Sequence, residues 1–392
     1  MEIIKRDRHE YKCTLIPLTP IQIGDGNEIY TYDYVIKDGI YYRIEVSELF
    51  EKLPEKERDT LIKMLENNNI IKTRKFIKDN YKPEYGYLYK CQVSTEVRDN
   101  YERKIDGVGN KNEENQLIIK EFIGNHRGKY IPGSTLKGAI RTAFLSEDFD
   151  KYKHSYRLER KDKGTAAFYM KNQYGKEARS KDLKYEADKR EANILNMNKL
   201  DPKMDPFKYL HVTDTEVKNN LIKIEELTRI PLKAKKVDMP MGKYEVTKSL
   251  FDKNDIEELN FKIIIQENQV SKELLNKLYK KESRKDMDII RETTDFYIED
   301  IFERLNNKAK KMIEEEKIFF GKVHHKRALN SYLELEKQLN NLKENEALIR
   351  VGTGSGFNST TFNLFNKKQE QIFTKVLIGS LPAGWAVITY EE

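Results

Sequence analysis

The chain has 392 residues, 38% hydrophobic and 35% charged, with a formal net charge of +7. This length allows two domains or one core with large insertions, and the charge permits nucleic-acid binding without proving it. Two cysteines, Cys13 and Cys91, exclude a disulfide scaffold and a cysteine-rich zinc site, and neither a secretory leader nor a transmembrane run is evident. We therefore expect a cytoplasmic protein without a membrane partner.

The N-terminal segment predicts two kinds of β-structure. Residues 11–15 alternate between apolar and polar types, which is typical of a half-buried strand. A loop with two glycines follows at residues 18–26. Asp38 and Gly39 then separate two strand-like runs, and this dipeptide is a strong signal for a hairpin turn.

A helix and further strands are expected before residue 125. Ser47 is expected to cap a helix that continues, with a break at Pro54, to about Asn67. Strand-like runs return at residues 86–95 and 117–123. Strand, helix and paired strands in this order fit a split βαβ, ferredoxin-like unit.

Residues 130–144 combine a turn with the start of a helix. A short apolar approach ends at Gly133, after which Ser134 or Thr135 can cap the helix. The uncapped N–H groups at a helix start attract anions, so this segment is a candidate site for a polyanion backbone. An ordinary loop and capped helix is an equally good interpretation of the residues alone.

Two cations strengthen the first interpretation. Lys137 and Arg141 are four residues apart and share one helix face, and Gly138 between them would let another backbone approach closely. The alternative is that both cations belong to a solvated face. Ala139 stands where a Walker loop needs lysine, which disfavours nucleoside-triphosphate chemistry.

Residues 146–208 resemble an insertion. Residues 151–190 hold thirteen Lys and Arg against six Asp and Glu, with tyrosines and phenylalanines interleaved. Cations and stacking aromatics could track RNA, but a charged run more often faces water.

Beyond the insertion the sequence predicts alternating strands and helices. Apolar residues recur at helical spacing between residues 290 and 312, within a helical block that extends over residues 271–343. The expected strands are at residues 209–217, 221–232, 244–250, 261–266, 373–378 and 385–390.

A second glycine-rich loop occupies residues 350–357. Arg350 precedes a Gly-x-Gly-x-Gly pattern formed by Gly352, Gly354 and Gly356, which does not match the dinucleotide fingerprint. Three glycines expose backbone N–H groups and allow close approach, so the loop could line a groove for a nucleic-acid backbone. A flexible surface hairpin is the alternative. Two such loops in a basic chain suggest one shared groove.

Candidates for catalysis are few. His324 and His325 are adjacent and point apart in regular structure, which favours a basic face over a metal site. His211 and Asp214 lie near a strand end, where capping a turn is the commoner role. Asp33 follows the first glycine loop, and no serine or cysteine nucleophile motif is present. We expect no catalytic residue, metal or cofactor.

The order of these motifs resembles the RAMP superfamily of CRISPR proteins. The resemblance lies in residues 18–26 and 33–36, in the signature-like residues 131–141, in the strand at 211–215, and in the glycine loop at 351–356. It implies an α+β fold of two RRM-like, ferredoxin-like halves with helical and charged insertions.

The resemblance also implies a division of the chain. The first half would cover residues 1–235 and carry the basic insertion at 146–208. The second half would cover residues 236–392 and carry the helical block at 271–343 and the glycine-rich loop at 350–357.

Within the superfamily the length and the Asp33-Tyr-Val-Ile variant most resemble the fifth-subunit family of the type III-A Csm effector complex. This resemblance implies a ribonucleoprotein subunit of antiviral defence that caps the complex, binds the 3′ region of the guide RNA and supports its maturation and assembly. Implied partners are guide RNA, target RNA, other Csm subunits and recruited nucleases. The residues expected at RNA are Gly133, Ser134, Thr135, Lys137, Arg141, Arg350, Gly352, Gly354 and Gly356.

Two alternatives remain open from the sequence. One is an endoribonuclease, with or without a metal, in which Asp33 or the pair of His211 and Asp214 would act. Tyr32 and Tyr34 flank Asp33, unlike the pattern of the RNA-cutting backbone paralogue, which disfavours cleavage. The other is a scaffold that binds only proteins through residues 271–343.

Overall fold

A computed structural model describes most of the chain. The described residues are 8–67, 69–107, 117–148, 156–160, 168–172, 188, 191–192, 194–195, 201–202, 205–232, 239–253, 256–266, 296–355 and 374–391. Most of the insertion predicted at 146–208, the first part of the helical block and the end of the second glycine loop lie outside this part of the chain.

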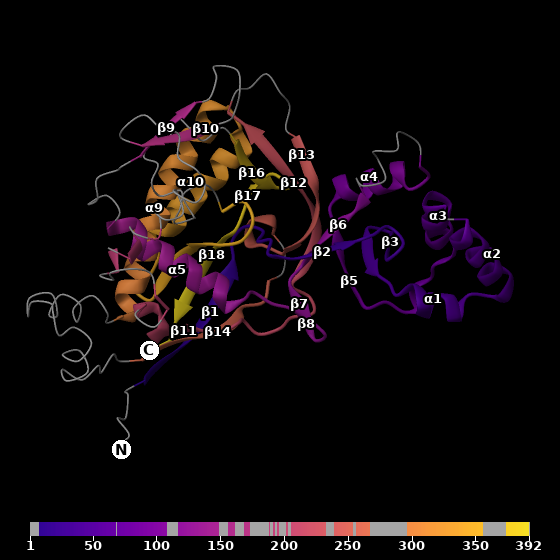
Figure 1. The fold of residues 1–392 in the computed structure, drawn as a ribbon, viewed down its shortest axis with the longest axis horizontal. Coiled ribbons are helices and arrows are strands. Elements are labelled where there is room, and N and C mark those ends of the chain that lie inside the picture. The colour runs from indigo at the N-terminus through magenta and orange to yellow at the C-terminus, as the bar shows by residue number, and fades with distance from the viewer. Residues whose placement is uncertain are drawn as a thin grey trace, which may run out of the picture.

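Five strands in the described part form an antiparallel sheet that contains both ends of the chain. Their order is β11 (Leu210–Val212), β14 (Leu259–Gln266), β1 (Arg8–Pro17), β18 (Trp385–Tyr390) and β15 (Glu346–Arg350). Two helices, α5 (Gly133–Asp148) and α9 (Ile298–Lys322), pack against each other and against the edge strands β11 and β15 (Figure 1). The chain order β1, α5, β11, β14, α9, β18 is that of a ferredoxin-like half.

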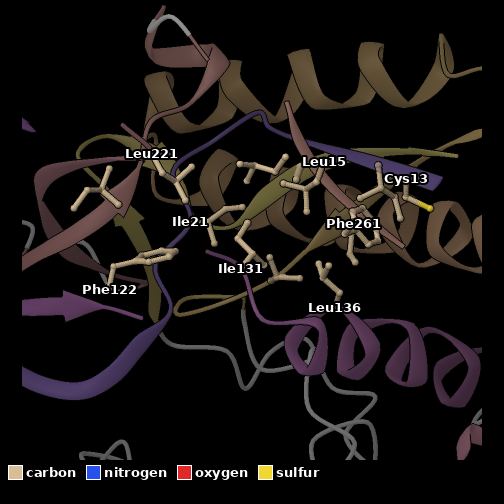
Figure 2. Close-up of a cluster of buried hydrophobic side chains, with 14 of the residues drawn as sticks. Cys13, Leu15, Ile21, Phe122, Ile131, Leu136, Leu221 and Phe261 are labelled. Carbon is tan, nitrogen blue, oxygen red and sulfur yellow. The ribbon is translucent and has the colours of Figure 1, made fainter. Parts of the chain in front are cut away.

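Strand β1 lies between β14 and β18 in this sheet, and its buried apolar side chains lie on one face. Cys13 and Leu15 are buried in it, as the alternation at residues 11–15 predicts. Leu15 pairs with Leu259 of β14 on one side and with Ile388 of β18 on the other. These residues belong to the largest buried cluster, which joins the sheet to Leu136 of α5 (Figure 2).

The second sheet curves beside the first. Among the described residues its main path is β2 (Gly24–Ile29), β6 (Ile119–Phe122), β13 (Met239–Thr247), β12 (Ile222–Pro231), β5 (Tyr89–Val93), β4 (Ile40–Arg43) and β3 (Tyr34–Lys37). Strand β16 (Thr374–Ile378) pairs with β12, and β17 (Leu381–Pro382) pairs with β16. A separate short hairpin joins β7 (Gly124–Asn125) and β8 (Gly128–Lys129). The predicted α+β class with two halves is confirmed.

The pairing of strands does not follow the boundary predicted near residue 235. Strands β12 and β13 lie on either side of that position and pair along most of their length. Strand β1 pairs with β14 and β18, both from beyond residue 235. Each sheet is therefore assembled from segments far apart in the sequence.

A helical lobe with its own small core extends from the second sheet. It contains α1 (Val46–Lys52), α2 (Glu55–Glu66), α3 (Ile70–Asn80) and α4 (Thr95–Lys104), which stand at the right of Figure 1. The hairpin β3–β4 is confirmed, since Asp38 and Gly39 both have positive φ. The break at Pro54 is also confirmed, but the predicted cap is wrong. Glu45 occupies the N-cap position, and Ser47 lies inside α1.

The helical block is confirmed for its described part. The predicted apolar spacing appears in α9, where Ile301, Leu305, Ala309 and Met312 are buried. A turn follows, and α10 (Lys326–Asn340) returns along α9. Of the predicted insertion the structure describes mainly a hairpin of β9 (Tyr156–Arg160) and β10 (Phe168–Asn172). None of the described helices is long and apolar enough to cross a membrane.

Candidate nucleic-acid interface

The start of α5 is built against the end of β11. Ile131 N donates to the Thr215 hydroxyl at 2.9 Å, and Thr215 N donates to the Ile131 carbonyl at 3.0 Å. A Cβ atom on Gly133 would lie 2.2 Å from the Val212 carbonyl oxygen, so only glycine allows this approach. The two motifs at residues 131–141 and 211–215 thus form one structural unit.

The cap of α5 comes from a residue that follows β11. Asp214 Oδ1 accepts the Gly133 N–H at 2.8 Å, whereas Ser134 and Thr135 lie within the first turn of the helix. The prediction that Ser134 or Thr135 caps the helix is therefore wrong, because the helix starts earlier and a distant carboxylate reaches its first N–H. This carboxylate also neutralises part of the helix dipole, so a phosphate is not expected at that first N–H group.

The two predicted cations of α5 have different environments. Arg141 forms ion pairs with Glu191 at 2.6 Å and with Asp205 at 2.8 Å, and its guanidinium stacks over Phe207. Lys137 is half-buried, and no hydrogen bond or ion pair joins it to another residue of the described part of the chain. Partial burial lowers the pKa of Lys137, while Asp205 partly opposes this effect. Lys137 is therefore the cation with capacity for a further partner.

The second glycine loop packs against the first. Thr353 N donates to the Gln22 carbonyl at 2.7 Å, and the two side chains are also hydrogen-bonded. Gly352 has a φ of +80°, and a Cβ atom on it would lie 2.3 Å from the same carbonyl. Gly354 also has a φ of +80°. Gly356 lies outside the described residues.

Arg350 points into the protein. Its side chain is 7% exposed and donates to Glu316 Oε1 at 2.9 Å, to the Ala383 carbonyl at 3.0 Å and to the Gly354 carbonyl at 2.9 Å. Lys375 binds the same Glu316 oxygen at 2.6 Å. These contacts give Arg350 a role in holding the glycine loop, and they occupy its guanidinium within the fold.

The two predicted segments share a neighbour. Ile21 and Ile131 belong to the same buried cluster, and Ile131 comes shortly before the first residues of α5 (Figure 2). The next residue, Gln22, binds the second glycine loop through Thr353. The start of α5 and the loop at residues 350–355 are thus arranged around one segment of the first loop.

Comparison with known proteins shows the family of this chain. The sequence model of the RAMP superfamily matches residues 14–358 of this chain. The chain belongs to the RAMP superfamily. It is similar to the CRISPR system protein Csm5 of Methanocaldococcus jannaschii, with 28% identity over 92% of this chain and 74% of that protein. It is also 28% identical to Csm5 of Streptococcus thermophilus, over 36% of this chain and 40% of that one.

Two solved structures share the RAMP fold of this chain. One is a subunit of a Csm–crRNA–target RNA ternary complex from a type III-A CRISPR-Cas system, with a TM-score of 0.62 and 18% identity over 97% of this chain and all of that one. The other is Csm5 of T. onnurineus, with a TM-score of 0.58 and 20% identity over 95% of this chain and 99% of that one.

In this RAMP fold the two carboxylates among the predicted alternative catalytic residues have structural partners. Asp33 is half-buried, 3.9 Å from the Arg43 guanidinium, and burial raises the pKa of its carboxyl. Asp214 caps α5, and His211 lies exposed on β11. The described part of the chain contains no group of three or more side chains that could hold a metal.

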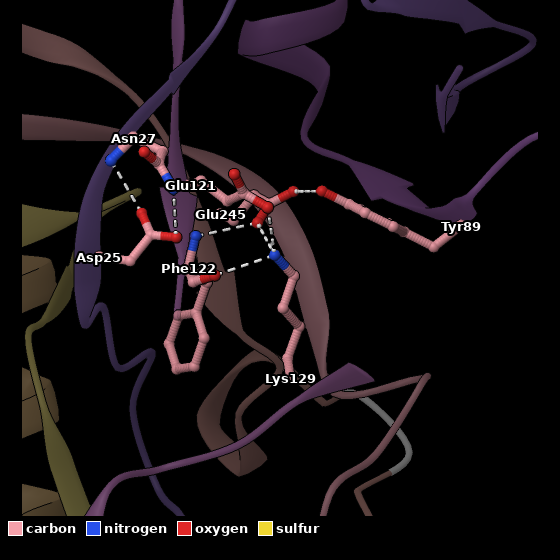
Figure 3. A network of polar contacts seen from close by, with 7 residues as sticks. All are labelled: Asp25, Asn27, Tyr89, Glu121, Phe122, Lys129 and Glu245. Carbon is pink, nitrogen blue, oxygen red and sulfur yellow. Dashed lines mark hydrogen bonds and ion pairs between the residues drawn. The ribbon is translucent and has the colours of Figure 1, made fainter. Parts of the chain in front are cut away.

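A buried charge network was not predicted from the sequence. Glu245 of β13 is fully buried and binds Lys129 of β8 at 3.0 Å, the Phe122 N–H at 2.9 Å and the Tyr89 hydroxyl (Figure 3). Burial raises the pKa of Glu245, and Lys129 with the two hydrogen bonds only partly opposes this. The network links three strands of the second sheet, β13, β6 and β5, to β8. Its members are far apart in sequence, so no local pattern reveals it.

Proposed function

We propose that this chain is the RNA-binding capping subunit of a type III-A Csm complex in antiviral defence. In this role it binds the 3′ region of the guide RNA and supports maturation of the RNA and assembly of the complex. Its partners are guide RNA, target RNA and other Csm subunits, with recruited nucleases as further partners. Similarity to Csm5 over 92% of the chain and the likeness to a subunit of a Csm–crRNA–target RNA complex support this proposal.

The observation that carries the RNA contact is the shared neighbour of the two glycine-rich segments. Lys137 and the exposed Ser134 and Gly138 lie at the start of α5, and Ile131 before this helix belongs to the same buried cluster as Ile21. The loop at residues 350–355 is fixed to Gln22. A sugar-phosphate backbone could contact the Lys137 ammonium and the exposed Ser134 there without any base being read.

The arrangement supports binding without chemistry by this chain. Asp33, His211 and Asp214 lie in two different motifs, and each carboxylate is engaged in the fold. We therefore assign no catalytic residue.

The test is the affinity of the full chain for guide RNA as a function of salt. Lys137→Ala is expected to weaken binding and to reduce the slope of log affinity against log salt by about 1, since one phosphate contact is lost. Arg141 is left unchanged because its loss would also break two ion pairs. The matched control is Lys56→Ala, an exposed lysine on α2 of the helical lobe. An unchanged affinity and slope for Lys137→Ala would exclude the proposed contact.

A further inference from the structure

Two exposed tyrosines form a stacked pair on the turn between β2 and β3. The rings of Tyr30 and Tyr32 are 5.7 Å apart between centroids, and their planes differ by 5°. The two residues are 44% and 37% exposed, in the part of the fold where the helical lobe joins the second sheet (Figure 1). The pair therefore keeps much of its surface in solvent.

The turn that carries the pair is held in place. Asp33 N donates to the Tyr30 carbonyl at 2.9 Å, which closes a β-turn. Thr31, which separates the two tyrosines in sequence, is 5% exposed and points inward. Arg43 donates to the Asp33 carbonyl at 2.8 Å and to the Ile44 carbonyl at 3.0 Å. The rings are therefore positioned before any ligand arrives, which lowers the ordering cost of binding.

We propose that Tyr30 and Tyr32 are a stacking platform for a base of single-stranded RNA. A nucleobase presents a flat π-face that extends an offset aromatic stack, and such stacking tolerates any base. This inference rests on the proposed function for its ligand, but it places a contact on a different part of the fold from α5 and the glycine loops.

The charges nearby favour a base over an arginine of a partner protein. An arginine stacked on tyrosine gains most where a free carboxylate also receives its N–H groups. Asp25, Glu28 and Asp33, which lie on β2 and on the turn, already have partners among the described residues. Asp25 accepts from Asn27, Glu28 lies 3.9 Å from Lys120, and Asp33 lies 3.9 Å from Arg43.

The experiment uses the full chain and a single-stranded oligouridine of about 12 nucleotides with 2-aminopurine at one internal position. Stacking of 2-aminopurine on the platform is expected to quench its fluorescence. Tyr30→Ala with Tyr32→Ala is expected to abolish the quenching and to weaken binding about 5- to 30-fold, with an unchanged salt slope. Tyr30→Phe with Tyr32→Phe keeps both rings and is expected to bind within about twofold of the native chain.

Tyr297→Ala is the matched control, since this tyrosine is 64% exposed at the start of α9. A thermal melt of each variant separates loss of binding from loss of fold. Unchanged quenching and affinity in the double alanine variant would overturn the platform. A variant that binds RNA normally but no longer joins partner subunits would also overturn it, in favour of a protein ligand.

If Lys137→Ala alone weakens binding, the proposed function stands without the platform. If neither variant changes binding, both proposals fail.

Discussion

Gly133 and Gly138 lie on the same helix, but the space around their Cα atoms differs. A Cβ atom on Gly133 would meet the Val212 carbonyl at 2.2 Å, whereas one on Gly138 would have no atom of the described part of the chain within 4 Å. Gly133→Ala is therefore expected to destabilise the chain by about 1–3 kcal/mol, since the start of α5 must move away from β11. Gly138→Ala is expected to stabilise it by about 0.5–1 kcal/mol through helix propensity.

Thermal and denaturant unfolding of the two variants measure this difference, with each glycine serving as the control for the other. Equal stability of both variants would contradict the close packing of Gly133 on β11. If Gly138→Ala is more stable but binds RNA less tightly, another backbone approaches that glycine in the complex.

The same local pattern gave Lys137 and Arg141 equal standing as RNA contacts, and the structure separates them. The carboxylates that engage Arg141 are 50 and 64 residues further along the chain. No spacing rule connects them to α5. Similarly, the glycine-rich sequence after Arg350 suggested a cation that contacts RNA. In the structure Arg350 binds Glu316 of α9, and Lys375 of β16 binds the same carboxylate. Local sequence locates a cation and does not reveal which distant carboxylate already binds it.

At the scale of elements, Glu316 of α9 connects the helix to the second glycine loop. Burial alone would raise the pKa of Glu316, but Arg350 and Lys375 outweigh it through attraction and hydrogen bonds and hold the pKa below its usual value of 4.5. A depressed carboxyl pKa contributes stability above the unfolded value, and this contribution is lost as the pH falls below about 4.5.

Glu316→Gln is expected to lower the free energy of unfolding by about 3–5 kcal/mol at neutral pH, because two buried cations lose their carboxylate. The difference in Tm between the native chain and this variant should shrink as the pH falls below about 4.5. Glu336→Gln is the control, since it breaks a partly exposed pair with Lys317 and should cost about 1 kcal/mol or less. A difference in Tm that is independent of pH would contradict the role of the ionised carboxylate.

Elements with a strong apolar period were predictable and short ones were less so. The spacing of Ile301, Leu305 and Ala309 predicted α9 because one wide stripe of that helix is buried. Helices α3 and α4 were not predicted, although Asn69 and Ser94 cap them in the structure. Their apolar faces are narrow, and few of their residues are buried where α3 packs against β3 and α4 against β12. Strand β11 is shorter than expected because the residues after it turn to cap α5.

At the scale of the whole molecule, the α+β class and the two halves could be predicted. Which segments of the sequence make up each half could not. Hydrophobic periodicity marks a strand without naming its partner. Strand β1 pairs with β18 from the opposite end of the chain, and β12 pairs with β13 across the predicted boundary. The ferredoxin-like half that carries α5 therefore needs segments from both sides of residue 235.

This interleaving predicts how the chain responds to being divided near residue 235. The fragment 1–235 would keep β1 and α5 but lose β14 and β18, the two neighbours of β1. The fragment 236–392 would keep β14 and β18 but lose the strand between them. Each fragment alone is expected to be insoluble or to melt without a cooperative transition, since its apolar strand faces have no partner.

Co-expression of both fragments is the control, because the same strands can then pair between two chains. We expect the fragments to purify together and to recover a cooperative melt and the RNA affinity of the intact chain. A cooperative transition in fragment 1–235 alone would mean that its strands complete a sheet without β14 and β18. Since β1 has a hydrogen-bonded neighbour on each side only when both fragments are present, solubility and RNA binding should be recovered together.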